Sequence, residues 1–556
     1  MPTYVIPPDT RAIGTGNPAQ DVNELSDMEG LLAAVLAQFA GFPGGSSIPA
    51  DNAANVTAVR SLLGTFPGPG LAPSGDTTGA TDPGLIQSLL NLAGKAPLQS
   101  GTFYLGGSSA LALSSSGAVL DGNGYGLTAI EIVSAFSGAE AVSIAAPNCT
   151  VRDLTITASS STISSNPACN GIEVQGGSYQ VTLRNLFFSN VNGWAIEAVN
   201  VTGHPDISHA LWDNIMIYDT AGGIHFNGNQ ATVGTVISNL QIGNIGTGTG
   251  PNANLDAFFA QDAFDIIMTG GGLGVGNLGT GHCMHFKGTC ANIWVVNADC
   301  GGYPEPLAKT QCGIFVEDDT NGSSNGLRFI GGVLQTFGIG AEVSGAASNI
   351  WFTDMAFDNN LTHGSSLTGT GSNINFMGCS WGEAESNGQA ADGGTYYDFS
   401  LTGSPGATGY VRSSRMCSPV VAAGTAGVQG VTAITGGTAM MFEHVDFLGA
   451  SSSIGNIFTN QPNFVRDCRN YNPHGAATVS VPASGSATSA LHYDAFYYIT
   501  PGTGGLTILR NTNGNGGGAG PSMTLPAGVM ATIFVRAGTN LTYTYTNAPT
   551  HIVDGN

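Results

Sequence analysis

The chain has 556 residues, of which only 9% are charged and 83 are glycine, and its formal net charge is −23. Ordinary domains are about 25% charged, but an apolar content of 42% is ample for a long core, so the chain is not disordered. Its 14 lysines and arginines form no basic patch of the kind that duplex nucleic acid needs. Anionic membrane surfaces would repel this charge, and no run approaches the roughly 18 apolar residues of a membrane span. We therefore expect no nucleic-acid partner and no membrane insertion.

The first part of the chain predicts an extended arm and then short helices. Residues 1–24 carry Pro, Gly and Asn without periodicity, and they show neither the basic nor the apolar segment of a secretory signal. A helical region is predicted over 25–97: a capping box starts at Ser26, and further apolar stripes lie near 52–63 and from Asp82. These stripes are too short to fold alone, so the helices should pack on each other, on the next domain or on other subunits.

A short pattern recurs through residues 98–474 and predicts a mainly β fold. Its form is apolar–x–apolar–x–(Asn or Asp)–apolar–x–apolar, clearest in NIWVVNADC (292–300) and NIWFTDMAF (349–357). The period of two predicts strands, and the polar residue predicts a bend with left-handed backbone. Stacked coils must repeat one inward apolar face, so the repeat predicts a parallel β-helix. Further copies begin at Cys149, Val181, Ala210 and Thr235 and, more loosely, at Leu327, Ile374 and Met440.

Many copies are followed by a second short strand, and aligning these strands predicts a candidate site. If the apolar neighbours point inward, the central residue of each strand points outward, and successive coils stack about 4.8 Å apart. That spacing suits the carboxylate separations of glycosidases. Asp265, with Asp262 beside it and His225 and His285 flanking it, is the predicted catalytic cluster. The simpler alternative is that outward residues of any solvated sheet are polar, or that a subunit interface covers them. The predicted column contains Glu173, Glu197, His225, Asp265, His285 and Glu342.

The remaining polar motifs are weaker. The acidic segment EDDTNG adds Glu317, Asp318 and Asp319 as candidate substrate contacts, although such segments are also ordinary acidic turns. The nine cysteines are scattered and several fall at inward positions, so we interpret them as small buried residues rather than a disulfide framework. GHCMHFKGTC (281–290) matches no standard zinc ligand set. We therefore expect no metal and no cofactor.

The coil pattern fades near Tyr471, and long alternating strands follow. They predict a separate all-β, sandwich-like module at 475–556, either for trimerisation or for receptor binding. NTNGNGGGAGPS (511–522) predicts a flexible loop within it, and the alternation of Leu541, Tyr543 and Tyr545 is interpreted as a subunit contact.

One segment carries a family resemblance. SGTFYLGGSSALALSSSGAVLDGNG (100–124) resembles the entry coil of pectate-lyase-like right-handed β-helices. With a helical N-terminal region and a small C-terminal β-module, the whole chain resembles bacteriophage tailspikes and minor tail proteins, and its Arg, Ala and Gly usage resembles phages of GC-rich, actinobacterial hosts. The ordered motifs of pectinase-like glycosidases are absent around Asp318-Asp319.

The resemblance implies a virion protein of the phage tail. Such proteins are typically homotrimers that dock on other tail proteins through their N-terminal part. They recognise a host cell-surface glycan and sometimes cleave it, as a glycoside hydrolase or polysaccharide lyase. Two alternatives remain open: a free bacterial polysaccharide-degrading enzyme or surface adhesin, and a purely structural tail component.

Overall fold

The computed structural model describes residues 70–200, 207–228, 232–245, 252, 255–275, 281–302, 311–382, 397–400, 408–416, 429–431, 439–446, 465–466, 481–488, 495–511, 519–535 and 539–555. The predicted arm and the first two predicted helices lie outside these residues. The third predicted helix is confirmed as α3 (Asp82–Ala93), with proline in its first turn and Gly94 in the left-handed region at its end. Within the described part of the chain, no helix is long and apolar enough to cross a bilayer.

Helix α3 covers the open edge of the first coil, which consists of β1 (Lys95–Pro97), β2 (Gly101–Leu105) and β3 (Leu111–Leu113). The helix buries Ile86, Leu89 and Leu90. Its carboxylate at Asp82 accepts the Tyr104 N–H at 2.9 Å. The Gln87 amide accepts the Ala112 N–H at 2.8 Å and donates to the Ala112 carbonyl at 3.0 Å. Backbone groups that would otherwise be unpaired at the sheet edge are thus satisfied by helix side chains.

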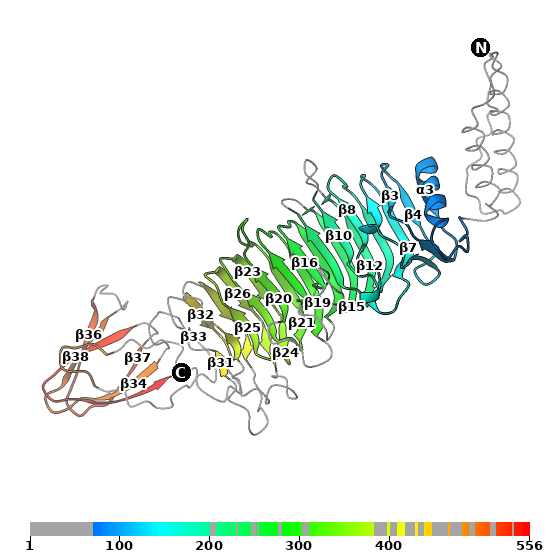
Figure 1. Cartoon of the computed structure of the whole chain (residues 1–556). Coiled ribbons are helices and arrows are strands. Elements are labelled where there is room, and N and C mark those ends of the chain that lie inside the picture. Colours follow the sequence, from blue (N-terminus) through cyan, green and yellow to red (C-terminus); the bar gives the residue numbers. More distant parts are fainter. Residues whose placement is uncertain are drawn as a thin grey trace, which may run out of the picture. The chain divides into compact units, whose positions relative to one another are not determined.

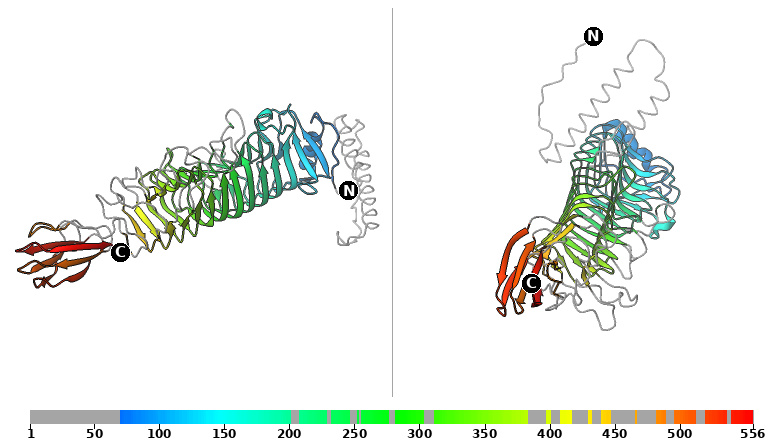
Figure 2. Two further views of the ribbon diagram at one scale, coloured as in Figure 1. Left: turned by 90° about the horizontal axis from the view of Figure 1, so that it is seen from below. Right: turned by 90° about the vertical axis from the view of Figure 1, so that its left-hand side faces the viewer.

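The coils that follow form two parallel sheets, and the predicted parallel β-helix is confirmed (Figure 1 and Figure 2). Among the described residues, one sheet has 19 strands and is called the bent sheet; the other has 12 and is called the short-strand sheet. Besides β1 and β2, the bent sheet contains β4 (Val119–Asp121), β5 (Thr128–Ile132), β7 (Thr150–Ala158), β9 (Thr182–Ser189), β12 (Leu211–Tyr218), β15 (Thr235–Ile245), β17 (Ile266–Val275), β19 (Trp294–Gly302), β21 (Arg328–Gln335), β23 (Ser348–Thr353), β24 (Ala356–Asp358), β26 (Ser372–Met377), β27 (Ser380–Trp381), β29 (Thr408–Arg412), β30 (Arg415–Met416), β32 (Ala439–Glu443) and β33 (Val465–Arg466).

The short-strand sheet carries the candidate site. Its register runs in sequence order, so each coil adds one strand beside the strand of the previous coil. Besides β3, it contains β6 (Glu140–Ile144), β8 (Asn170–Gln175), β10 (Trp194–Val199), β13 (Gly222–Asn227), β16 (Phe258–Gln261), β18 (Met284–Lys287), β20 (Cys312–Glu317), β22 (Ile339–Val343), β25 (His363–Leu367), β28 (Tyr397–Ser400) and β31 (Gln429–Val431). Outside both sheets lie a short parallel pair, β11 (Ile207–Ser208) with β14 (Thr232–Val233), and the 3-10 turn η1 (Ile163–Ser165).

The polar residue of the repeated pattern sits at the bend of the bent sheet, as predicted. Its φ is +53° at Asn214 and +51° at Asn185, in the left-handed region that Asn tolerates better than most residues. The bends of successive coils are also joined by side chains: the Asn214 amide donates to Asn185 at 2.9 Å, and the Asn185 amide donates to Asp153 at 2.7 Å. Asp153, Asn239, Asn297 and Asp354 share the same positive φ.

The interior of the solenoid is a stack of apolar residues. Aromatic rings from successive coils pack face to face, with ring centroids 5.0 Å apart for Phe329 and Phe352 and 4.6 Å for Phe352 and Phe376. Trp381, predicted to point inward, is fully buried. The seven described cysteines are buried and form no disulfide, in agreement with the sequence; Cys417 and Cys468 lie outside the described residues.

The C-terminal module consists of two antiparallel three-stranded sheets, so the predicted all-β, sandwich-like module is confirmed. One shared core contains side chains from both sheets. Two predictions here are wrong. The segment 511–522 is not all loop, because its two ends belong to strands. Leu541 and Tyr543 are buried in the core of the module, so they are not a subunit contact. The sheets are β37 (Ala531–Val535), β34 (Ala495–Thr500) and β39 (Thr550–Gly555), and β36 (Ala519–Leu525), β35 (Leu506–Asn511) and β38 (Asn540–Tyr545).

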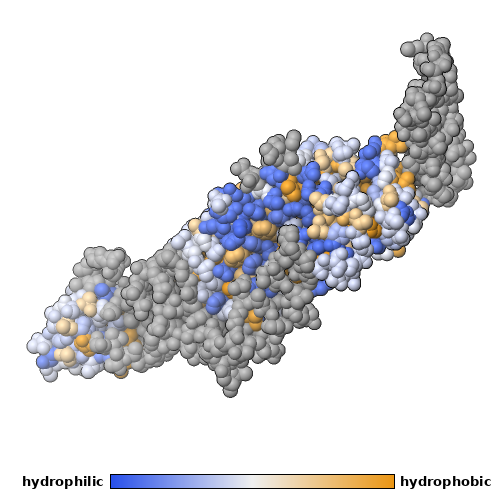
Figure 3. Space-filling model, in the orientation of Figure 1, coloured by the Kyte–Doolittle hydropathy of each residue, from blue (hydrophilic) through white to orange (hydrophobic). Residues whose placement is uncertain are grey.

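The outer surface of the solenoid is not uniform. On the face that Figure 3 shows, hydrophilic residues gather over the middle coils, and hydrophobic residues are more frequent toward α3. Leu92 of α3 and Leu127 before β5 are among the most exposed apolar side chains, at 64% and 59%.

Candidate functional site

The strand register places one outward residue of each coil in a single column on the short-strand sheet. Glu173 of β8 lies opposite Glu197 of β10, which lies opposite His225 of β13. The column continues through β16 to His285 of β18, and through β20 to Glu342 of β22. The flanking apolar residues are buried, as the alternation predicted. The column is therefore confirmed for Glu173, Glu197, His225, His285 and Glu342.

The placement of Asp265 in this column is wrong. Phe259 of β16 pairs with His225 on one side and His285 on the other, so Phe259 occupies the position assigned to Asp265. Asp265 instead has a φ of +53° and precedes β17 of the bent sheet. In the sequence, Phe264-Asp265-Ile266 matches the other second strands, because it has a polar residue between two apolar ones. A phenylalanine that points outward breaks the alternation of apolar inward and polar outward residues, so the pattern does not predict Phe259. It does not predict Phe315 of β20 for the same reason.

The first half of the site centres on Glu197. His225 Nδ1 lies 2.9 Å from one carboxylate oxygen of Glu197, and the amide of Asn170 donates to the other at 2.5 Å. Burial works to raise the pKa of Glu197, but the hydrogen bond and the charge of His225 outweigh it and lower that pKa. Burial and the neighbouring charge of Glu173 raise the pKa of Glu140 in β6. This end of the column is thus a group of carboxylates of which one is held ionised.

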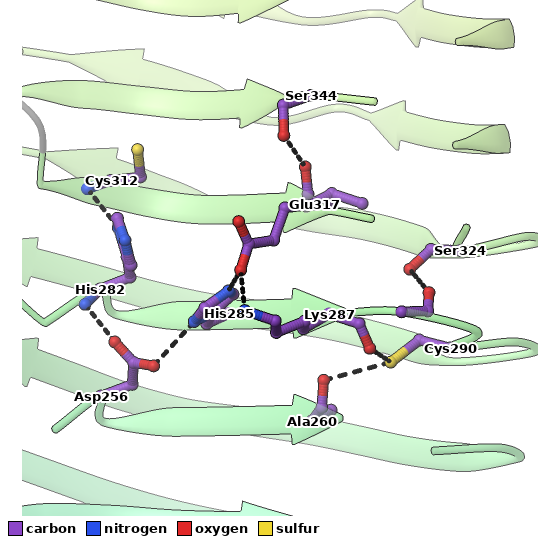
Figure 4. A network of polar contacts seen from close by, with 12 residues as sticks. Asp256, Ala260, His282, His285, Lys287, Cys290, Cys312, Glu317, Ser324 and Ser344 are labelled. Carbon is purple, nitrogen blue, oxygen red and sulfur yellow. Dashed lines mark hydrogen bonds and ion pairs between the residues drawn. The ribbon is translucent and has the colours of Figure 1, made fainter. Parts of the chain in front are cut away.

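The second half of the site centres on His285 (Figure 4). Its Nδ1 lies 2.9 Å from Asp256, and its Nε2 lies 3.2 Å from Glu317, which Lys287 also contacts at 2.8 Å. The Asp256 carboxylate also accepts the backbone N–H of His282 at 2.5 Å. Asp256 and His282 are additions that sequence reasoning missed, because both precede their strands and lie outside the repeated pattern.

Electrostatic effects at His285 and Glu317 follow from these contacts. Burial works to lower the pKa of His285, but its hydrogen bonds to Asp256 and Glu317 outweigh burial and raise it. The hydrogen bond from His285, helped by Lys287 and only partly offset by burial, lowers the pKa of Glu317 to about 2. Burial lowers the pKa of His282 to about 4. At neutral pH, Glu317 is therefore ionised and His282 is neutral.

Aromatic rings connect the two halves. The ring of His225 stacks on Phe259 with centroids 4.8 Å apart, and Phe259 stacks on His285 at 4.5 Å. Phe315 continues the series, 5.1 Å from His285. Neither Phe259 nor Phe315 is fully buried. Because the rings stack on one another, the outer face of the sheet presents their apolar edges interleaved with hydrogen-bonding groups, a combination that suits a ligand with apolar patches and hydroxyl groups.

The last column residue, Glu342, differs from Glu317. It lies opposite Phe315 in the register and accepts a hydrogen bond from the Thr368 hydroxyl at 3.0 Å. Burial, together with the charge of Glu317, raises the pKa of Glu342. Two carboxyl groups on adjacent strands thus have pKa values pushed in opposite directions, a pattern found where one acid and one base are needed.

The remaining predicted residues lie at turns beyond the strands. Asp262 is only 2% exposed, and its carboxylate accepts hydrogen bonds from the Thr289 N–H, the Thr289 hydroxyl and the Asn321 amide. Asp319 accepts the Asn321 N–H at 2.6 Å, and Asp318 accepts the Ala346 N–H at 2.7 Å. These contacts support the turns of successive coils. The catalytic assignment of Asp262 and Asp265 remains a prediction.

The site residues do not resemble a metal centre. Across the described ranges, no group of three or more His, Cys, Asp or Glu side chains could hold a metal ion.

The comparisons with known proteins concern the fold. No protein-family model and no curated protein matches the sequence. The A-module of a mannuronan C-5 epimerase from Azotobacter vinelandii is 13% identical with a TM-score of 0.42, covering 72% of this chain and 97% of that one. Tailspike protein 3 of bacteriophage CBA120 is 13% identical with a TM-score of 0.39, covering 83% and 72%. The catalytic domain of a GH87 alpha-1,3-glucanase is 13% identical with a TM-score of 0.36, covering 73% and 69%. By its own strand pairing, the chain is a parallel β-helix protein with a column of acidic, histidine and aromatic residues on its short-strand sheet.

Proposed function

We propose that the chain is a phage attachment protein of the tailspike or minor tail type, which binds a host cell-envelope glycan on the outer face of the short-strand sheet. The observation that carries this proposal is the column itself. Carboxylates, imidazoles and phenyl rings alternate in register from β8 to β22. A column that repeats from coil to coil offers similar contacts to successive units of a linear polymer.

The charge of the site narrows the ligand class. Glu173, Glu197 and Glu342 make the column acidic, and Lys287 is already paired with Glu317. A polyanionic glycan would be repelled by these carboxylates and by the net charge of −23. The proposed ligand is therefore a neutral glycan.

The virion location, the homotrimer and docking on other tail proteins through the N-terminal region also belong to the proposal. They are supported by the order of domains along the sequence. Among the alternatives, a structural tail component predicts no bound glycan in the binding test, whereas a free polysaccharide-degrading enzyme or an adhesin would also bind one.

The test is binding of the purified full chain to an array of bacterial envelope glycans. We expect at least one neutral glycan to bind, and Phe259→Ala and Phe315→Ala to weaken that binding about tenfold or more, as for truncated aromatic anchors. Phe187→Ala is the matched control, because Phe187 is an outward, partly buried phenylalanine of β9 in the bent sheet. No bound glycan, or equal effects of all three substitutions, would argue against the proposed surface.

A second candidate function, glycan cleavage, rests on Glu317 and Glu342. Their Cα atoms are one coil and two residues apart, roughly 8 Å, a backbone spacing that allows the carboxyl separation of inverting glycosidases. Glu342, whose pKa is raised, would protonate the leaving oxygen, while ionised Glu317 would take a proton from the attacking water. The glycosidic C–O bond breaks as the bond to the water oxygen forms.

Cleavage is tested by mass spectrometry of oligosaccharides released from the bound glycan. Glu342→Gln and Glu317→Gln should each abolish release while the glycan still binds. Glu131→Gln, an outward glutamate of β5 in the bent sheet, is the control and should cleave normally. Binding without release by the unaltered chain would leave attachment as the function and exclude cleavage of that glycan.

A further inference from the structure

One histidine of the column has an unused hydrogen-bonding atom. The side chain of His225 is only 9% exposed, and its Nδ1 lies 2.9 Å from Glu197. Its Nε2 is buried and has no hydrogen-bond partner within the described part of the chain. Buried polar atoms are almost always paired, so an unpaired one is a place where a ligand or water belongs.

The contact with Glu197 fixes the chemistry of that free atom. The hydrogen bond and charge of His225 keep the pKa of Glu197 low against the effect of burial, so its carboxylate is ionised and can only accept. Nδ1 therefore carries the proton. Nε2 is then an acceptor in the neutral ring and a donor in the charged ring, and a hydroxyl group can be the partner of either form.

The ring cannot turn to satisfy Nε2 elsewhere. It lies between Trp194, with centroids 4.7 Å apart, and Phe259, at 4.8 Å and an interplanar angle of 6°. The direction of Nε2 is therefore set before any ligand arrives, and such preorganisation lowers the entropic cost of binding.

We propose that His225 is the centre of a glycan subsite, in which a sugar hydroxyl is the hydrogen-bond partner of Nε2. The inference rests on the proposed function and identifies His225 as the residue that binds one sugar unit of the glycan. The surrounding groups favour a hydroxyl donor over an anion, because Glu173 and Glu197 lie in the same column. A third carboxyl group, Glu140, lies close enough for burial, together with the charges of Glu173 and Glu197, to raise its pKa.

Two substitutions separate the two nitrogens of the imidazole. The amide of His225→Asn occupies the place of Nδ1 and keeps a partner for Glu197, but it lacks an atom at the place of Nε2. The longer His225→Gln reaches that place. The control is His209→Asn, because His209 is exposed and has a φ of +56° that asparagine tolerates.

The probes are the methyl glycosides of glucose, galactose, mannose and rhamnose, titrated by calorimetry up to 100 mM and soaked into crystals. At least one should bind, with a hydroxyl oxygen within hydrogen-bond distance of Nε2. His225→Asn should lower its affinity about fivefold or more, the loss of a typical hydrogen bond. His225→Gln should lose less affinity than His225→Asn, and the control His209→Asn should stay within about twofold of the unaltered chain.

Three outcomes overturn the inference: no glycoside binds, His225→Asn binds as tightly as the unaltered chain, or a water stays on Nε2 in saturated crystals. These outcomes are distinct from failure of the proposed function. An envelope glycan that binds the unaltered chain and His225→Asn equally removes the subsite but keeps the attachment role. Absence of any bound envelope glycan removes both.

Discussion

The left-handed bends of the solenoid predict which substitutions at Asn214 lower the free energy of unfolding most. Asn214 has a φ of +53°, and its amide donates to Asn185 at 2.9 Å. Alanine lacks the local side-chain hydrogen bonding by which asparagine offsets the cost of the left-handed region, so Asn214→Ala leaves that cost, about 1–2 kcal/mol, uncompensated. It also removes the hydrogen bond, about 1 kcal/mol. We expect a total loss of about 2–3 kcal/mol in the free energy of unfolding.

Asn214→Gly separates the cost of the left-handed backbone from the loss of the hydrogen bond to Asn185. Glycine adopts a positive φ without steric cost, so only the hydrogen bond and about 0.5–1 kcal/mol of backbone entropy are lost. We therefore expect Asn214→Gly to be more stable than Asn214→Ala by about 1 kcal/mol. The measurement is urea unfolding followed by circular dichroism, with reversibility checked by refolding.

The control for this pair is Asn123, which also makes a side-chain hydrogen bond but lies outside the left-handed region. There the order should reverse, with Ala equal to or more stable than Gly. If Asn214→Ala proves as stable as Asn214→Gly, the left-handed bend is not the reason why the repeated pattern carries Asn or Asp.

Three further predictions concern the site and the assembly. Because the pKa of Glu317 is depressed to about 2, the unaltered chain should exceed Glu317→Gln in stability above pH about 4.5, and the difference should vanish as pH falls toward 2. The partly exposed carboxylate limits this difference to about 1 kcal/mol, and a difference that persists at pH 2 would contradict the assignment. Asp262→Ala should lower the free energy of unfolding by about 1–3 kcal/mol, because the partly buried Thr289 N–H loses its acceptor; unchanged stability would show that the turn does not depend on this hydrogen bond. Light scattering of the intact chain should give about three times 56.3 kDa, and a monomer at micromolar concentration would refute the homotrimer.

The sequence predicted the parallel β-helix because stacking imposes the same inward face on every coil. The bend residues could be read directly, since only a few residue types tolerate their backbone conformation. The register of Glu173, Glu197 and His225 was also predictable from the sequence, because each lies between two inward apolar residues.

The rest of the site could not be found from alternation alone. Phe259 and Phe315 point outward although they are apolar, so a pattern that equates apolar with inward passes over them. Asp256 reaches His285 from a position just before β16, outside the repeated pattern. Asp265 fits the strand pattern in sequence but falls at a bend. The alternation of apolar and polar residues along a strand does not predict side-chain contacts between residues that only the folded coils bring together.

The side chains of α3 that pair with the first coil have a consequence for self-assembly. A parallel sheet with a bare edge is a template that another chain can extend, and stacked coils add without limit because each new layer reproduces the edge it covers. Asp82 occupies one edge N–H, and the Gln87 amide occupies the N–H and the carbonyl of Ala112. Because no further strand can then add at these positions, the helix is a terminator of one-dimensional growth. A chain that lacked it would present the edge of β2 and β3 to its neighbours and would be prone to elongate into fibres.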